Sequence, residues 1–284
     1  MKSWFQTEPV SERLIRIIGA TGECMFLALG EERAMLVDTG TGLGDLKGLV
    51  ESITQKPLTV VLTHGHVDHA RGVSQFDSFY MNEKDLFLMD EKSGGLDPVE
   101  YIRSMAIPAG EPALAEVGIE DLQPVADLRN FLAMKDGDLF DLGGLTAVLL
   151  ALPGHTPGSM AVLFPEEKTL LTGDACCGAT LLSFPYSSFV EEYEKTVRAF
   201  DARVKGLFST VLVSHGNRTF GPELIDTMLE TCREILRGED EAIPMQGLDG
   251  NPAMTAHAMD FVRGRHDGKS GNIVYSPDRI RKNR

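Results

Sequence analysis

The stretch Leu58-Thr-Val-Val-Leu-Thr-His-Gly-His-Val-Asp-His69 places an apolar run directly before three histidines and an aspartate. The run Leu58–Leu62 contains two adjacent valines and no charge, which is typical of a strand that is buried on both faces. The polar half that follows carries three of the seven histidines in the chain. Neutral imidazoles and carboxylates are ligands that zinc and its neighbouring divalent metals prefer. The stretch therefore predicts a buried strand whose end carries a metal site.

The spacing inside this loop suggests two sets of ligands. In an extended segment, positions i and i+2 project to the same side, so His64 and His66 can hold one ion. Asp68 and His69 follow a tighter turn and can face a second ion, and Gly65 lets the backbone bend without a Cβ clash. The alternative is a histidine-rich polar loop without a metal. Burying so many titratable groups without a counter-ion would be costly, which disfavours that alternative.

The segments around the loop predict a layered α/β fold. Two apolar runs at 13–18 and 24–29 are separated by Gly-Ala-Thr-Gly and predict a hairpin. A strand at 33–37 and a helix at 45–54, whose apolar residues recur at helical spacing, precede the strand at 58–62. Beyond residue 135 we expect strands at 139–142, 145–152, 159–164, 169–172 and 210–214, with helices at 188–203 and 222–237.

The middle of the chain, about 83–135, predicts a helical insertion that covers the α/β scaffold. Helical stretches at 83–91 and 98–105 are separated by glycine and proline residues. We interpret the insertion as part of one domain that spans residues 1–284.

Three further metal-ligand candidates each follow a predicted strand. His155 lies in a rigid Pro-Gly-His-Thr-Pro-Gly loop, Asp174 follows the strand at 169–172, and His215 follows the strand at 210–214. Each alone is more often a cap or a hydrogen-bonding residue. Together they are informative, because ligands bind at the carboxyl ends of strands in open α/β sheets.

In this order, the motifs His-x-His-x-Asp-His, Pro-Gly-His-Thr-Pro-Gly, Gly-Asp and Ser-His-Gly resemble those of the metallo-β-lactamase superfamily, over about residues 13–237. The resemblance implies a four-layered αβ/βα sandwich with two divalent ions at one edge, usually zinc, with iron or manganese as alternatives. It further implies that one ion is held by His64, His66 and His155, and the other by Asp68, His69 and His215. Asp174 would bridge the two ions, and Asp38 would orient the ligands from behind.

Departures from the family pattern bear on the substrate. Asp174 stands where true β-lactamases often have cysteine, and Cys176 and Cys177 are out of register, so the site resembles thioesterases of the glyoxalase II type and lactonases. His66, where diiron flavoproteins have glutamate, disfavours oxygen reduction. Arg71 replaces a common small residue, and we expect it to face solvent, with contact to an anionic substrate as the alternative.

Composition and charge exclude several classes of protein. The chain is 43% hydrophobic with a net charge of −15, enough for a core and unlike a protein that grips phosphate backbones. Residues 263–284, in contrast, are basic. We interpret this tail as a solvated end of the chain, with contact to an anionic substrate or partner as the alternative. The four cysteines form no disulfide framework, and the sequence shows neither an apolar leader nor a membrane span. We therefore expect a cytoplasmic protein that acts on a small molecule and contacts no membrane or nucleic acid. A monomer and a homo-oligomer are both compatible with the sequence.

These features predict a dinuclear metal hydrolase. Bound divalent metal lowers the pKa of water to about 7 and so supplies a bridging hydroxide that attacks a small ester, thioester or lactone. Asp68 is the expected catalytic residue, which orients the nucleophile and takes part in proton transfer; the substrate-binding residues are unknown. Two alternatives are an iron sulfur dioxygenase, with His64, His155 and Asp174 holding one iron, and a phosphodiesterase or nuclease. Tyr186 is either a hydrogen-bond donor to substrate or a packing residue, and His257 and His266 have no role that spacing decides.

Overall fold

The structure is a computed structural model, and it describes residues 4–90, 96–216, 218–260 and 264–282. The chain divides into two compact units, residues 1–148 and 149–284, with the boundary inside strand β9. Glu91, at the end of one predicted helix, and two basic residues of the tail, Arg263 and Arg284, lie outside the described residues.

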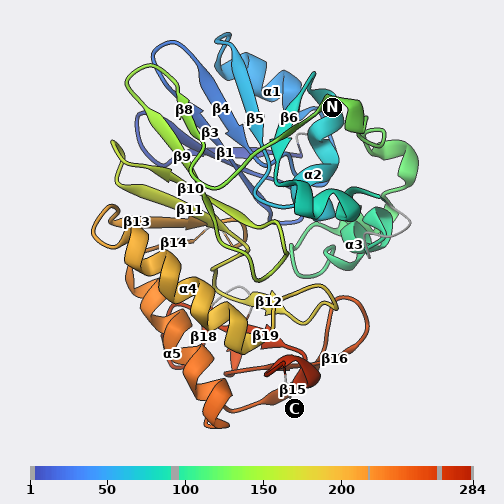
Figure 1. The fold of residues 1–284 in the computed structure, drawn as a ribbon. Helices are drawn as coiled ribbons and strands as arrows, with labels where there is room; N and C mark the ends of the chain where they lie inside the picture. Colours follow the sequence, from blue (N-terminus) through green and yellow to red (C-terminus); the bar gives the residue numbers. More distant parts are fainter. Residues whose placement is uncertain (1–3, 91–95, 217, 261–263, 283–284) are drawn as a thin grey trace. The chain divides into compact units, whose positions relative to one another are not determined.

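The first unit is built on a seven-stranded sheet in the order β1 to β7 (Figure 1). The pairs β1–β2, β2–β3 and β3–β4 are antiparallel. The pairs β4–β5, β5–β6 and β6–β7 are parallel. The predicted hairpin is confirmed as β2 and β3. The strands are β1 (Gln6–Pro9), β2 (Leu14–Ile18), β3 (Cys24–Leu29), β4 (Ala34–Val37), β5 (Leu58–Val61), β6 (Phe79–Met81) and β7 (Phe131–Ala133).

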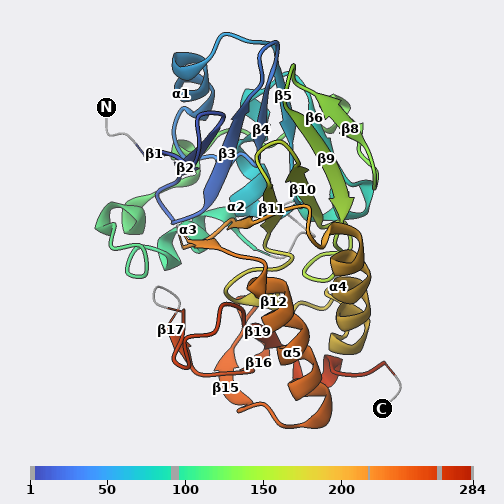
Figure 2. The same ribbon diagram turned by 90° about the vertical axis from the view of Figure 1, so that its left-hand side faces the viewer.

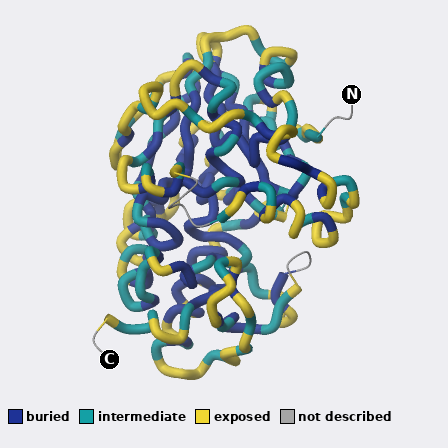
Figure 3. Tube along the Cα trace, turned by 90° about the vertical axis from the view of Figure 1, so that its right-hand side faces the viewer, coloured by how far each residue is buried: buried dark blue, intermediate teal, exposed yellow. Residues whose placement is uncertain are grey.

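Helix α1 (Leu46–Ile53) connects the parallel strands β4 and β5 and covers one face of this sheet. It begins at Asp45, whose side chain accepts a hydrogen bond from the backbone of Gly48 at 2.8 Å, as an N-cap residue does. Leu46 and Val50, four residues apart on one face of α1, are buried against alternate residues of the central strands. Alternate residues of a strand point to the same face of the sheet, so the two apolar faces pack together. Figure 3 shows these strands in the colour of buried residues.

The segment between β5 and β8 contains short helices. After α2 (Val67–Ala70) and the 3-10 helix η1 (Arg71–Gln75), the described residues of the region predicted as helical insertion contain one α-helix, α3 (Pro98–Ser104). The helix predicted at 83–91 is a 3-10 helix over its described part. The 3-10 helices of this region are η2 (Glu83–Met89), η3 (Pro112–Glu116), η4 (Ile119–Asp121) and η5 (Leu128–Asn130). The region ends in β7, an edge strand of the sheet, which the sequence analysis did not predict.

The second unit contains a mixed sheet with the strand order β14-β13-β11-β10-β9, in which β13 runs parallel to β11. Strand β9 (Thr146–Ala151) begins in the first unit, where it pairs with β8 (Leu139–Asp141). The other strands of the sheet are β10 (Met160–Phe164), β11 (Thr169–Gly173), β13 (Thr210–Val213) and β14 (Thr219–Phe220). Helices α4 (Val190–Val204) and α5 (Glu223–Arg237) lie side by side (Figure 2), close to their predicted positions.

A smaller four-stranded sheet in the order β12-β19-β16-β15 completes this unit. Its strands are β12 (Thr180–Leu182), β15 (Ile243–Gln246), β16 (Pro252–Thr255) and β19 (Ile273–Tyr275), and a two-stranded ribbon pairs β17 (Met259–Asp260) with β18 (Gly264–Arg265). A 3-10 helix, η6 (Pro277–Arg279), follows. Among the described residues, no helix combines the length and the apolar composition that crossing a membrane requires.

Candidate metal centre

His64 and His66 lie in the turn that joins β5 to α2, and both side chains are buried. Their facing nitrogens, His64 Nε2 and His66 Nδ1, are 3.1 Å apart. Two ring nitrogens at this distance share either a proton or a cation. Tetrahedral zinc, with Zn–N bonds of about 2.0–2.1 Å, holds its nitrogen ligands about 3.3 Å apart. The pair therefore fits a metal ion.

Asp38 fastens this turn to the end of β4. Its Oδ1 accepts a hydrogen bond from the Thr63 backbone N–H at 2.7 Å, and its Oδ2 accepts one from Thr63 Oγ1 at 2.8 Å. The same Oδ2 lies 3.0 Å from Nδ1 of His69. Because a carboxylate only accepts, His69 donates from Nδ1 and keeps the lone pair of Nε2 for a metal. The backbone of Asp38 has a φ of 65°, a left-handed conformation that aspartate and asparagine tolerate better than most residues.

Asp68 and His69 lie within the single turn of α2. Asp68 Oδ2 accepts a hydrogen bond from the Tyr101 hydroxyl at 2.7 Å and lies 3.5 Å from His69 Nε2. Nothing in the local sequence pattern around Tyr101 indicates this contact. The tyrosine is 33 residues from Asp68, in a helix where an aromatic residue is ordinarily part of the core.

Glu23 is a second residue that the sequence analysis did not single out. Its buried carboxylate accepts hydrogen bonds from the backbone and hydroxyl of Thr21 and from those of Thr41, which ties together two loops of the first unit. Burial raises the pKa of Glu23, and the nearby Asp68 carboxylate raises it further, against the effect of the Thr21 hydrogen bond. Burial and the neighbouring Asp68 carboxylate therefore both disfavour the charged form of Glu23.

Gly65 allows a close approach between the histidine loop and η2. A Cβ at this position would lie 2.7 Å from the backbone oxygen of Asp85 and 3.0 Å from Cβ of Leu88. The Gly65 N–H donates to Asp85 Oδ2 at 3.2 Å. The glycine is thus required for space between two backbones as well as for the bend that the sequence suggested.

In the second unit, His155, Asp174 and His215 lie close together at strand ends. Asp174 Oδ2 is 3.2 Å from Nε2 of His215 and 3.8 Å from Nε2 of His155. His155 Nδ1 lies 2.8 Å from the Leu181 carbonyl oxygen, which can only accept, so His155 donates from Nδ1 and turns the Nε2 lone pair toward the carboxylate. Lone pairs of nitrogen and oxygen that face each other fit a cation between them.

Tyr193 of α4 supports the loops that carry two of these residues. Its hydroxyl donates to the Ala175 carbonyl, next to Asp174, at 2.5 Å. Its ring lies against Gly154, next to His155, where a Cβ would come within 2.2 Å of the ring. The loops that carry His155 and Asp174 therefore both contact one buried side chain.

Three further expectations concern residues near these ligands. Arg71 does not face solvent as expected: its Nε and one terminal nitrogen are buried, and it lines a largely apolar cavity of the first unit with Val67 and Met89. Tyr186 stacks on Phe184 with ring centres 5.3 Å apart, which is a packing role. Cys176 is a buried free thiol whose pKa is raised by burial, so it remains neutral and is a poor metal ligand.

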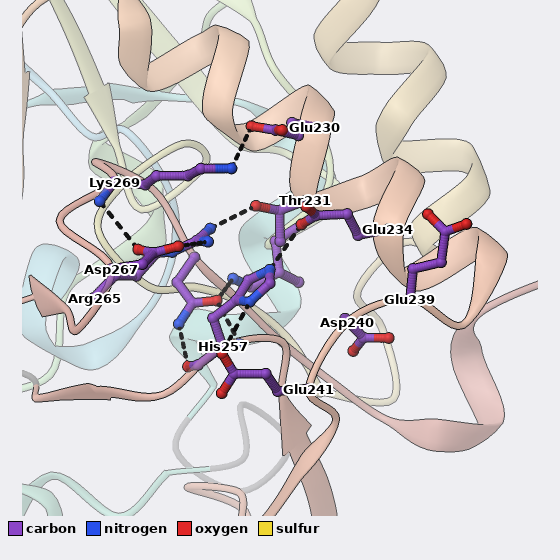
Figure 4. Close-up of polar contacts among 12 residues, drawn as sticks. Glu230, Thr231, Glu234, Glu239, Asp240, Glu241, His257, Arg265, Asp267 and Lys269 are labelled. Carbon is purple, nitrogen blue, oxygen red and sulfur yellow. Dashed lines mark hydrogen bonds and ion pairs between the residues drawn. The ribbon is translucent and has the colours of Figure 1, made fainter.

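The described part of the basic tail is held by local ion pairs. Figure 4 shows His257 between Glu234 and Glu241; its Nε2 lies 2.7 Å from Glu234, and its Nδ1 lies 3.6 Å from Glu241. Lys269 pairs with Glu230 of α5 at 2.8 Å, which lowers the pKa of Glu230. His257 is thus a hydrogen-bonding residue of the second unit, and His266 is exposed in a turn after β18.

Comparison with known proteins identifies the family. The sequence model of the Metallo-beta-lactamase superfamily matches residues 21–215, which is more than half of the chain. The chain belongs to the metallo-beta-lactamase superfamily. The predicted family and its α/β sandwich fold are thereby confirmed. Each unit contains His/Asp groups that fit the divalent metals typical of this superfamily.

Relatives of this superfamily member include named hydrolases, in agreement with the predicted enzyme class. The chain is 27% identical over 215 residues to Acyl-coenzyme A thioesterase MBLAC2 of Homo sapiens, which covers 70% of this chain and 74% of that protein. It is 24% identical over 220 residues to Hydroxyacylglutathione hydrolase GloC of Haemophilus influenzae, which covers 72% of this chain and 91% of that protein.

Solved structures support the fold. A metallo-beta-lactamase from Pontibacter korlensis aligns with a TM-score of 0.56 at 17% identity, over 81% of this chain and 99% of that chain. The sec-alkylsulfatase Pisa1 from Pseudomonas sp. aligns with a TM-score of 0.60 at 16% identity, over 81% of this chain and 41% of that chain.

Proposed function

We propose that this chain is a dinuclear metal hydrolase that cleaves a small ester, lactone or, by preference, thioester. In this proposal His64, His66 and His155 would hold one divalent ion, Asp68, His69 and His215 would hold the other, and Asp174 would contribute to both. Zinc is the first candidate for both ions, and iron or manganese are alternatives. Asp38 orients the set without binding a metal.

The observation that carries the proposal is the convergence of metal-binding atoms within each unit. In the first unit, two histidine nitrogens face each other at 3.1 Å, and Asp38 fixes the proton of His69 on Nδ1. In the second unit, a carboxylate oxygen faces the Nε2 atoms of His155 and His215. Most of these groups are buried, and buried imidazoles and carboxylates are costly to keep without a cation.

Bound divalent ions supply a water-derived nucleophile at neutral pH and polarise the oxygen of the bond that breaks. The chain supplies orientation and proton transfer. Asp38 holds His69 in one tautomer, and the Leu181 carbonyl does the same for His155. Asp68 accepts the proton of the attacking water and delivers it to the leaving group. No serine or cysteine nucleophile is required.

A thioester is favoured because the two relatives named above act, by their names, on an acyl group carried by coenzyme A or by glutathione. The candidate ligands are His and Asp side chains, with Asp174 rather than a cysteine among them, so the ligand atoms are nitrogen and oxygen. The net charge of −15 disfavours a nucleic-acid substrate.

The test is a metal analysis followed by a substrate panel. We expect two equivalents of divalent metal per chain and hydrolysis of acyl thioesters that is lost with a chelator and restored by zinc. Asp68→Ala should abolish hydrolysis, and Asp77→Asn, which changes an exposed carboxylate of the same unit, should not. One iron per chain with oxygen consumption on a persulfide would replace the proposal by a dioxygenase. Cleavage of phosphodiesters alone would replace it by a phosphodiesterase.

A further inference from the structure

We infer that Tyr101 is a positioning residue for Asp68, through which the inserted segment controls the geometry of the metal centre. The inference rests on the proposed function, because it assigns Tyr101 a role in holding a residue that the proposal makes a ligand and proton acceptor. No motif of the superfamily that the sequence displays includes this tyrosine.

The contact is short and buried. The Tyr101 hydroxyl donates to Asp68 Oδ2 at 2.7 Å, and the two residues are 8% and 6% exposed. A hydrogen bond from a neutral donor to a carboxylate in such a place is charge-assisted and stronger than a neutral pair. Asp68 Oδ2 also faces His69 Nε2 at 3.5 Å, so the same oxygen is fixed relative to two side chains.

The phenol is held by a core of its own. Tyr101 is buried in a cluster with Ile102 of α3 and Leu114 of η3, and Val67 of α2 packs against that cluster. Helix α3 begins at Asp97, whose side chain accepts a hydrogen bond from the Glu100 backbone at 2.8 Å. The hydroxyl therefore has a fixed position, set by packed apolar side chains that also contact the helix on which Asp68 lies.

The consequence concerns rotation of the carboxylate. A free aspartate turns about its last side-chain bond and exchanges Oδ1 and Oδ2, because that torsion has a broad two-fold profile. The hydrogen bond on Oδ2 selects one orientation, in which this oxygen also faces the lone pair of His69 Nε2 at 3.5 Å. Loss of an outer hydrogen bond of this kind typically costs about 10–100-fold in metal affinity or activity.

The test compares Tyr101→Phe with Tyr275→Phe in the full chain, with Co²⁺ as the probe metal. The two variants are matched, because the Tyr275 hydroxyl also donates to an aspartate, Asp240 Oδ2, at 2.7 Å, and neither of those residues is a ligand candidate. Tyr101→Phe should change the visible spectrum of bound Co²⁺, weaken Co²⁺ binding about 10-fold or more, and lower kcat with little change in KM. Tyr275→Phe should leave the spectrum and kcat unchanged.

A purely structural role for Tyr101 gives a different result. If Tyr101→Phe lowers the Tm of the metal-free protein but leaves the Co²⁺ spectrum, the Co²⁺ affinity and kcat as in the wild type, the inference is wrong. Asp68→Asn separates this failure from failure of the proposed function. If Asp68→Asn loses Co²⁺ affinity and hydrolysis while Tyr101→Phe does not, only the role of Tyr101 is refuted. If Asp68→Asn also has no effect, the proposed function fails with it.

Discussion

Replacement of Asp38 by asparagine should uncouple the stability of the protein from its metal affinity. Asp38 Oδ2 receives hydrogen bonds from Thr63 Oγ1 and His69 Nδ1, at 2.8 and 3.0 Å. In Asp38→Asn an amide NH₂ takes the place of one carboxylate oxygen. The Thr63 hydroxyl can reverse and accept, but His69 Nδ1 must then also accept, which moves its proton to Nε2. A protonated Nε2 has no lone pair for a metal.

The expected stability loss is modest for asparagine and large for alanine. Asparagine keeps the shape, tolerates φ of 65° and retains three hydrogen bonds, which fall from about 1.5–3 kcal/mol for a charged partner to about 0.5–1.5 kcal/mol each. Alanine leaves three buried donors without an acceptor, at about 1–3 kcal/mol each. We therefore expect a loss of about 3 kcal/mol in the free energy of unfolding for Asp38→Asn, about 1 kcal/mol for each of the three bonds, and a larger loss of up to about 9 kcal/mol for Asp38→Ala.

The assay is urea unfolding in the presence of a chelator, followed by competition for Zn²⁺ against a chromogenic chelator. Asp38→Asn should fold and yet bind Zn²⁺ about 10–100-fold more weakly, since it disturbs a group that orients a ligand. Folded Asp38→Asn with the Zn²⁺ affinity of the wild type would refute the tautomer argument. An equal stability loss in both variants would show that the buried donors find other partners.

Three further outcomes follow from the same physical chemistry. Gly65→Ala should lower the Tm by several degrees, because the new Cβ would lie 2.7 Å from the Asp85 backbone oxygen. The control Gly178→Ala should leave the Tm unchanged, because its Cβ would lie 3.9 Å from the nearest atom. Equal Tm values for the two variants would show that the loop relaxes. Hydrogen bonds from Arg265 lower the pKa of Asp267 below its usual 3.8, so the stability from this pair is complete above that value and is lost as the pH falls through the lower, folded-state pKa. Asp267→Asn should therefore flatten the acid limb of stability measured by urea unfolding from pH 6 to 2, and an unchanged limb would contradict the pairing. The four buried cysteines should react with a thiol reagent at pH 8 only after denaturation, and fast reaction of the native protein would contradict their burial.

Local pattern accounts for much of the fold. The hairpin of β2 and β3, helix α1, strand β5 and the helices α4 and α5 lie within a few residues of their predicted positions. In these segments apolar spacing, a capping residue or a glycine turn agrees with the final packing. The strands that were not predicted, such as β6, β7 and β15, have three or four residues each, so their pairing depends on neighbours distant in the sequence rather than on their own composition.

Local pattern was enough to predict the types of candidate ligand and their grouping around His64–His69, because adjacent residues in a turn after a buried strand cannot be far apart. The order of the remaining motifs along the chain was enough to indicate the superfamily. Only the packed structure shows which oxygen of Asp68 receives the Tyr101 hydroxyl, which nitrogen of His69 carries its proton, and that two guanidinium nitrogens of the half-buried Arg71 are shielded from solvent. These are choices of hydrogen-bond partner and environment. They depend on side chains brought together by packing across 30 or more residues, for which no local spacing provides information.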